Sequence, residues 1–462
     1  MGNPNNAKRF DGAKMIPLVG LLILTILVHL SVSQPVIAAG VIGAAVYVGV
    51  LVKAGVWRTM VGTSVLVSVL RSGPPGVLLG EAAWYALQFG PILAAWAMLL
   101  KHKPAEARQS DRNVVLFLIL FVLAALATNL TSLTPSATLP QTVLLTVMTG
   151  FLIFTYQRRW ITKEVIQADV AIVFSIITAV HLVAVASVFV GQAWAFDPDY
   201  GRFRGLLSNA NYAGMMSAIG LSIGLYLLRA PRRGRVAVMA SMVVLLVALL
   251  MSGSRGSLLA VIMGVVVLVL SRAGRKVIIP LASLAGLATI FAVLIVPKVF
   301  DGLDKFFFRD AASPDITSGR FEIYLGMLSL FSHSPFTGTG YRSTEALSPG
   351  ASGLTGHNIY LTILTETGLF GALFFAGLSI AVLAASGAGK VGRPLLVVVV
   401  TIAAVELTES SIYGWGGPTA LTAWLMILAF AASGRFLKEV ETAAQDQIAA
   451  AVSVRPLATL TR

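Results

Sequence analysis

Long, nearly uncharged apolar runs recur along most of the chain and restrict its fold more than any other feature. Runs such as 113–130, 168–191 and 358–385 are each long enough to cross a bilayer core of about 30 Å as a helix. Hydrophobic residues make up 57% of the sequence and charged residues only 12%, a composition that few soluble domains share. Because lipid satisfies no free backbone group, such runs must span as helices. The sequence therefore predicts an all-α polytopic membrane protein.

The apolar runs give about fourteen candidate spans. The third is short and is compatible with a re-entrant segment, so the prediction is 12–14 transmembrane helices. The runs are 15–33, 35–52, 57–71, 76–100, 113–130, 137–156, 168–191, 210–228, 236–252, 256–271, 276–297, 358–385, 394–412 and 417–434.

Basic residues fall at every second gap between these runs, as in 101–112, 157–163 and 229–235. By the positive-inside rule these gaps are cytoplasmic, which places both termini inside. Much of the formal net charge of +14 is then a topology signal. The sequence has no basic patch with interleaved aromatic residues, the pattern that would indicate nucleic-acid binding. The basic N-terminus leads into the first run without a prompt cleavage site, and we expect an uncleaved signal anchor.

The runs group into a single transmembrane domain, 1–434, followed by a cytoplasmic polar tail, 435–462. The longest gap on the outer side, 298–357, precedes the last three spans. Within it, apolar residues at helical spacing predict an amphipathic helix that begins at Arg320 and lies on the membrane. The chain has no cysteine, which excludes disulfides and thiolate metal sites.

Several arginines lie on the outer side, against the prevailing charge bias. Placing an arginine at a helix centre costs ~2.5–3.5 kcal/mol on insertion scales, and somewhat less near the interface. A phosphate ligand would offset that cost, because it matches a planar guanidinium with five donors. The outer arginines are Arg202 and Arg204 in the gap 192–209, Arg255 in the turn 252–257, and Arg309, Arg320 and Arg342 in the gap 298–357.

Arg255 stands between small residues in the stretch SGSRGS. The flanking glycines and serines allow close backbone approach and leave N–H groups at the start of the next helix, an arrangement that favours anions. Two other interpretations remain open. The side chain could extend to lipid headgroups, or it could pair with a carboxylate such as Glu322 or Glu409. Arg202 and Arg204, taken alone, are also compatible with ordinary loop charges.

His357 opens the span after the long outer gap. A helix N-terminus and nearby arginines favour a neutral imidazole there, which suits a general base. The alternative is a histidine hydrogen-bonded to loop backbone. Glu366 lies nine residues further on, inside the span, and an intramembrane carboxylate serves equally well in a structural ion pair or in catalysis. His333 has the character of an ordinary exposed residue.

Four motifs follow one another in the C-terminal half: SGSRGSLLA, SGRFEIY, GTGY and GHNIYLTILTETGLFG. In this order, over roughly residues 200–385, they resemble the bacterial O-antigen ligase superfamily, which also includes polysaccharide polymerases and protein O-oligosaccharyltransferases. The resemblance implies a C-type glycosyltransferase-like architecture. It also implies transfer of a glycan from undecaprenyl diphosphate to an acceptor at the periplasmic face of the bacterial inner membrane, without metal or other cofactor.

By the same resemblance, Arg255 and Arg320 correspond to diphosphate ligands and His357 to the base that activates the acceptor hydroxyl. Arg202 or Arg204 corresponds to an arginine of the preceding outer loop, and the sequence leaves that choice open. The weak candidates for a magnesium site are Asp197 with Asp199, and Asp301 with Asp304. The secondary site candidates are Glu366, Tyr341, Arg342 and Asn358.

We expect an O-antigen ligase that uses lipid A–core oligosaccharide as acceptor and inverts the anomeric carbon, since no carboxylate is well placed as a nucleophile. An O-antigen or polysaccharide polymerase, which uses a second lipid-linked glycan, is the alternative within the superfamily. A transporter or flippase of lipid-linked sugars is the alternative of another class, although we find no internal repeat typical of transporters. The sequence does not predict the sugar or the oligomeric state.

Overall fold

The computed structural model describes residues 54–72, 81–105, 108–189, 191, 193–197, 201–229, 234–270, 320–347, 357–386, 393–415, 417 and 419–435. These residues form helices joined by turns, with one isolated antiparallel bridge between Phe196 and Phe203. The helices are α3 (Val56–Ser72), α4 (Glu81–Leu99), α5 (Gln109–Ala127), η3 (Thr128–Leu130), α6 (Pro135–Arg158), α7 (Lys163–Phe189), η4 (Ala193–Ala195), α8 (Ala210–Arg229), α9 (Arg235–Ser252), α10 (Arg255–Leu270), α13 (Arg320–His333), α14 (Ser343–Leu347), α15 (Ile359–Ser386), α16 (Arg393–Val405) and α17 (Ala420–Ser433).

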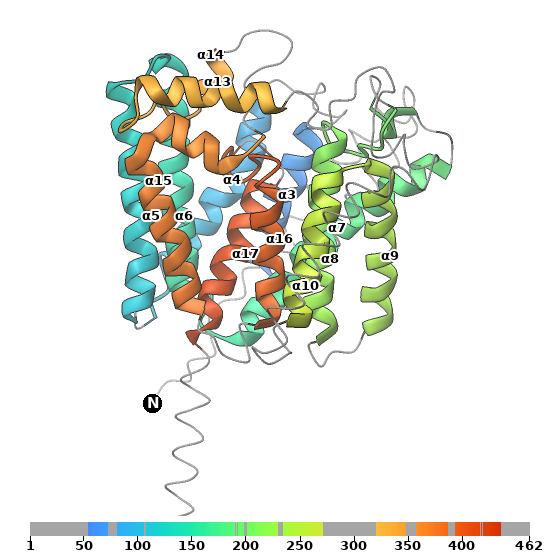
Figure 1. Cartoon of the computed structure of the whole chain (residues 1–462). Helices are drawn as coiled ribbons and strands as arrows, with labels where there is room; N and C mark the ends of the chain where they lie inside the picture. Colours follow the sequence, from blue (N-terminus) through green and yellow to red (C-terminus); the bar gives the residue numbers. More distant parts are fainter. Residues whose placement is uncertain are drawn as a thin grey trace, which may run out of the picture.

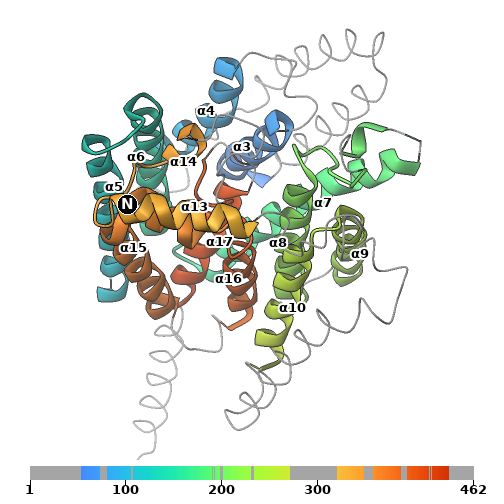
Figure 2. The same ribbon diagram turned by 45° about the horizontal axis from the view of Figure 1, so that its top comes forward.

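Figure 1 shows the long helices running roughly parallel, with α13 lying across one end of the bundle. We call this end the His357 end, and the opposite end, where α17 finishes, the Arg435 end. In the turned view of Figure 2, α13 is seen side-on and lies across the front of the other helices. Nearly every residue of α17 is buried, as expected for a helix that is apolar on all sides and lies in the centre.

The fold is that of a multi-pass membrane protein. Among the described residues, six helices are long and apolar enough to cross a membrane: α5 together with η3, α6, α7, α8, α9 and α15. Four shorter apolar helices, α4, α10, α16 and α17, lie among them. The outer helices α5, α9 and α15 expose large apolar side chains such as Leu123, Val243 and Leu373, a surface that lipid would cover.

The predicted all-helical architecture is confirmed over the described residues. The predicted spans 15–33, 35–52 and 276–297 lie outside them, so the number of 12–14 spans stays a prediction. One boundary differs: the run 394–412 was expected to be a single span, but α16 ends at Val405. The carboxylate of Glu406 accepts the backbone N–H of Ser411 at 2.9 Å, which turns the chain out of the helix.

Small residues allow neighbouring helices to approach closely, as is common in membrane bundles. A Cβ at Gly224 of α8 would meet the Met242 side chain of α9, and one at Gly264 of α10 would meet Thr401 of α16. On the other side of the bundle, Gly377 of α15 lies against the ring of Phe117 in α5. These contacts fix the neighbours of α8, α10 and α15, whose ends at the His357 end carry the candidate site.

The turn 334–341 docks into a break in α15. Gly368 sits inside α15 with φ +65°, a left-handed conformation that interrupts the regular helix. Backbone N–H groups of the turn donate into this break: Thr339 to the Thr365 carbonyl at 3.0 Å and Gly340 to the Glu366 carbonyl at 3.0 Å. The Gly/Pro-rich motif therefore supplies partners for carbonyls that the broken helix leaves free.

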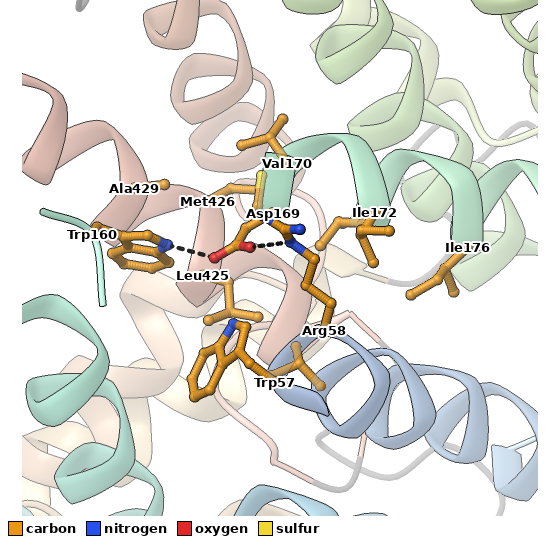
Figure 3. A pocket seen from close by; sticks show the side chains of 12 residues that line it. Trp57, Arg58, Trp160, Asp169, Val170, Ile172, Ile176, Leu425, Met426 and Ala429 are labelled. Atoms are coloured by element: carbon orange, nitrogen blue, oxygen red, sulfur yellow. Dashed lines mark hydrogen bonds and ion pairs between the residues drawn. The ribbon is translucent and has the colours of Figure 1, made fainter. Parts of the chain in front are cut away.

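Ion pairs fasten the Arg435 end. Figure 3 shows Asp169 of α7 accepting from Arg58 of α3 and from the indole of Trp160, beside a cavity lined mainly by apolar side chains. Asp111 of α5 likewise pairs with Arg108 and with Arg435. These carboxylates are already neutralised by arginines and lie at the opposite end from His357, so we assign them a structural role.

We predict that Gly368→Ala destabilises the protein by about 2–4 kcal/mol, because a Cβ there adds a left-handed backbone penalty and an overlap with the Phe336 backbone. Thermal unfolding of the detergent-purified protein measures the effect. Gly90→Ala in α4 is the matched control, since no atom lies within 4 Å of its added Cβ. Equal melting temperatures for the two variants would contradict the described break in α15.

Candidate active site

Segments that are far apart in the sequence meet at the carboxylate of Glu409. Arg320 Nη2 donates to Glu409 Oε1 at 2.9 Å, and Asn211 Nδ2 donates to the same oxygen at 2.8 Å. His357 Nδ1 lies 3.0 Å from Glu409 Oε2. The Glu409 side chain is only 14% exposed, so these donors replace most of its water. We call Arg320, His357, Asn211 and Glu409 the Glu409 cluster.

The helix ends place these side chains. Arg320 is the first residue of α13, and its Nη1 also donates to the Thr408 carbonyl at 2.7 Å. Asn358 caps α15, because its Oδ1 accepts the backbone N–H of Leu361 at 3.1 Å. His357 therefore stands immediately before a capped helix start, and its backbone position is fixed by that cap.

The structure distinguishes Arg202 from Arg204, the two arginines that the sequence left as alternatives. Arg202 Nη2 donates to Asn211 Oδ1 at 3.0 Å, and its Nε donates to the Ser252 carbonyl at 2.8 Å. Asn211 thus links Arg202 to the Glu409 cluster. Arg204 Nε instead donates to the Trp194 carbonyl at 3.4 Å. Of the two, Arg202 is the one that the structure brings to the cluster.

Arg255 lies at the same end of the bundle, half-buried at the first residue of α10. The preceding Gly253 ends α9 with φ +58°, and a Cβ there would lie 3.4 Å from Arg202 Nε. The following Gly256 packs on Thr408, the neighbour of Glu409 in sequence. The SGSRGS turn therefore lies between Arg202 and the Glu409 segment, where Gly253 is favoured by its left-handed backbone and Gly256 by the closeness of Thr408.

His357 has one ring nitrogen engaged and one available. A carboxylate only accepts hydrogen bonds, so Nδ1 carries a hydrogen, and in a neutral ring the lone pair is then on Nε2. Nε2 makes no hydrogen bond with any residue that the structure describes, and the side chain is 32% exposed. Tyr324 donates its hydroxyl to the His357 carbonyl at 3.0 Å, and burial raises the pKa of Tyr324, which keeps that hydroxyl protonated.

Glu366, a secondary candidate, is buried in a structural role. Its carboxylate accepts the backbone N–H groups of Arg342 at 2.6 Å and Thr344 at 3.1 Å, at the start of α14, and also the Thr344 hydroxyl. The other secondary candidates also have structural contacts. Tyr341 is buried and donates to the Tyr413 carbonyl at 2.7 Å, and Arg342 pairs with Glu345. None of the four has a hydrogen bond to the Glu409 carboxylate among the described contacts.

The described residues contain no group of three or more His, Cys, Asp or Glu side chains that would hold a metal ion. Of the four aspartates considered for magnesium, only Asp197 belongs to the described part of the chain. Asp199, Asp301 and Asp304 lie outside the described residues, and the expectation of a metal-free site stays a prediction.

Sequence reasoning did not place Glu409 or Asn211 in the site. Glu409 entered only as one possible partner of Arg255, whereas its described partners are Arg320, His357 and Asn211. The available signal was the carboxylate itself, since an ionisable residue in an apolar run indicates function by default. Asn211 gave no comparable signal, because an asparagine beside a predicted helix start more often caps the helix.

The comparison with known families places much of this site within one domain. Residues 240–376 match the family described as O-antigen ligase. The matched stretch contains Arg255, Arg320 and His357, whereas Arg202 and Glu409 lie outside it. No curated protein matches the chain.

We predict that Glu366→Ala destabilises the protein by about 3–5 kcal/mol. The substitution removes the carboxylate that accepts the buried N–H groups of Arg342 and Thr344 in the wild type, and leaves them without a hydrogen-bond partner. Thermal unfolding in detergent provides the measurement, with Glu345→Ala, a partly exposed carboxylate next to the same turn, as control. A stable Glu366→Ala protein that has lost function would instead return Glu366 to the candidate active site.

Proposed function

We propose that this chain, which carries an O-antigen ligase domain over residues 240–376, moves O-antigen polysaccharide from undecaprenyl diphosphate to lipid A–core oligosaccharide. One observation carries the proposal: Arg202, Arg320 and His357 gather around Glu409 at one membrane end of an apolar bundle. Such a place suits substrates that are themselves lipids with a polar head. We further propose the bacterial inner membrane, with the His357 end on the periplasmic side.

The arginines would bind the donor diphosphate. As sugar transfer proceeds, negative charge develops on the departing diphosphate, and fixed guanidinium groups stabilise it. Each charge-assisted hydrogen bond contributes about 1.5–3 kcal/mol, so two or three arginines supply a large part of the stabilisation that the leaving group needs. Arg202, Arg255 and Arg320 lie at the same end of the bundle and are the residues to which we assign this role.

His357 would act as the general base. Its Nε2 takes the proton of the acceptor hydroxyl while that oxygen bonds to the anomeric carbon of the donor sugar. The bond between the anomeric carbon and the phosphate oxygen breaks, and its electron pair leaves with the diphosphate. Direct displacement of this kind inverts the anomeric carbon. The imidazolium then loses its proton to solvent, through the exposed part of the ring.

The surface around α13 suits lipid-linked substrates. The side chains of Phe321, Leu325 and Leu328 project from α13 and are exposed, and the ring of Phe336 in the docked turn lies tilted against the ring of Phe370 in α15. This apolar surface continues onto the exposed side of α15, which includes Leu373. A lipid that enters from the bilayer therefore meets apolar protein up to the level of the charged cluster, which supports the proposed approach of both substrates.

We predict that His357→Ala abolishes transfer, with a loss of about 10²–10⁴-fold, and leaves donor binding intact. Purified protein is combined with undecaprenyl-diphosphate-linked glycan and lipid A–core in EDTA without nucleotide, and the products are separated on a gel. A lipid A–core–glycan product that requires His357 supports the ligase. Longer lipid-linked chains would identify a polymerase, and a wild type without any covalent product would reject both enzymes in favour of transport.

We predict that Arg202→Gln weakens donor binding at least tenfold, whereas the matched variant Arg204→Gln changes it little. The reason is that Arg202 reaches the Glu409 cluster through Asn211 and Arg204 is directed to the Trp194 carbonyl. Titration of both variants with undecaprenyl diphosphate gives the two dissociation constants. Equal losses in the two variants would contradict the distinction that the geometry makes between them.

A further inference from the structure

The carboxylate of Glu409 is shared between the group we assign to the donor and the group we assign to the acceptor. Its Oε1 accepts from Arg320 and from Asn211, whereas its Oε2 accepts from His357. In this arrangement the charge of Arg320 is balanced by Glu409, and His357 lies beside a carboxylate that is already paired. The single negative charge of Glu409 cannot fully balance both Arg320 and a protonated His357.

We propose that Glu409 exchanges partners when the donor binds: the diphosphate takes Arg320, and the carboxylate is left to stabilise His357 as it accepts the proton of the acceptor. This inference rests on the proposed function and deepens it, because it makes the base dependent on an occupied donor site. Glu409 is then a positioning residue that acts through His357 and Arg320.

Arg320 is suited to such an exchange. A guanidinium has five N–H donors, of which Arg320 spends one on Glu409 and one on the Thr408 carbonyl. The side chain is 25% exposed, so a ligand can reach it without unfolding α13. A diphosphate carries more negative charge than one carboxylate and offers several oxygens to the planar fork. It therefore competes favourably for the guanidinium.

Asn211 keeps the released carboxylate in place. Its Nδ2 donates to Glu409 Oε1 at 2.8 Å, while its Oδ1 is held by Arg202 at 3.0 Å. When Arg320 turns to the donor, Glu409 still has this neutral donor on one oxygen and His357 on the other. The carboxylate then faces one partner that becomes charged during the reaction, and the imidazolium forms next to an uncompensated negative charge.

The decisive comparison uses Glu409→Gln in the full-length protein. We expect transfer from lipid-linked glycan to lipid A–core to fall at least 100-fold, because an amide cannot balance the imidazolium. We expect the dissociation constant for undecaprenyl diphosphate to be unchanged or up to about tenfold lower, because Arg320 no longer has to leave a carboxylate. A merely structural residue would weaken both. Glu409→Asp, which keeps the charge, should recover part of the rate.

The matched control is Glu322→Gln, which removes an exposed carboxylate from the same helix as Arg320 and should change neither quantity. Weaker binding of undecaprenyl diphosphate by a Glu409→Gln protein that melts at the wild-type temperature would overturn the exchange. Undiminished transfer by that variant would overturn it equally. The binding measurement uses no acceptor, so it tests the exchange even if wild-type protein transfers no glycan and the proposed function fails.

Discussion

A charge in an apolar molecule must bring its own partners, and the carboxylate of Glu409 shows how strongly this requirement organises the fold. Water is largely excluded from it, so side chains from α8, α13 and the start of α15 have to converge there. Of those helices, α8 and α15 are held by close packing against their neighbours, as in the contacts of Gly224 with Met242 of α9 and of Gly377 with Phe117 of α5. The packing of the apolar helices thus places the side chains of the Glu409 cluster, and the hydrogen bonds of that cluster in turn join the helices.

Hydrophobic run length was sufficient to predict most helices, because crossing a membrane demands a minimum length of apolar chain. The runs 137–156 and 210–228 correspond to α6 (Pro135–Arg158) and α8 (Ala210–Arg229). The length of an apolar run does not predict where a helix ends when a polar side chain turns the backbone out of the helix. The Glu406 carboxylate accepts the backbone N–H groups of Ser411 and Ile412 where α16 ends within an apolar run, a local effect of one side chain that a hydropathy average over a window does not register.

The cationic part of the candidate site was visible in the sequence, because these arginines lie in gaps that the positive-inside rule predicts to face outward, against the usual charge bias. Their mutual arrangement was not visible. Glu409 stands 89 residues from Arg320 and 198 from Asn211, and pairing over such distances depends on how the helices pack. The same applies to Arg202 and Arg204, two residues apart and chemically identical, which the structure directs to different acceptors.

The break at Gly368 divides α15 into two halves with different surroundings. The docked turn bonds to both sides of the break, and the start of the first half is tied to the Glu406 carbonyl, which accepts the Ile359 N–H at 3.0 Å. The half after it packs on α5, with Phe375 beside Phe121. The Glu409 cluster therefore belongs to a small polar assembly carried by an apolar bundle. Substitutions among the exposed apolar positions of that bundle, in evolution or by design for another bilayer, would leave the contacts of the cluster unchanged.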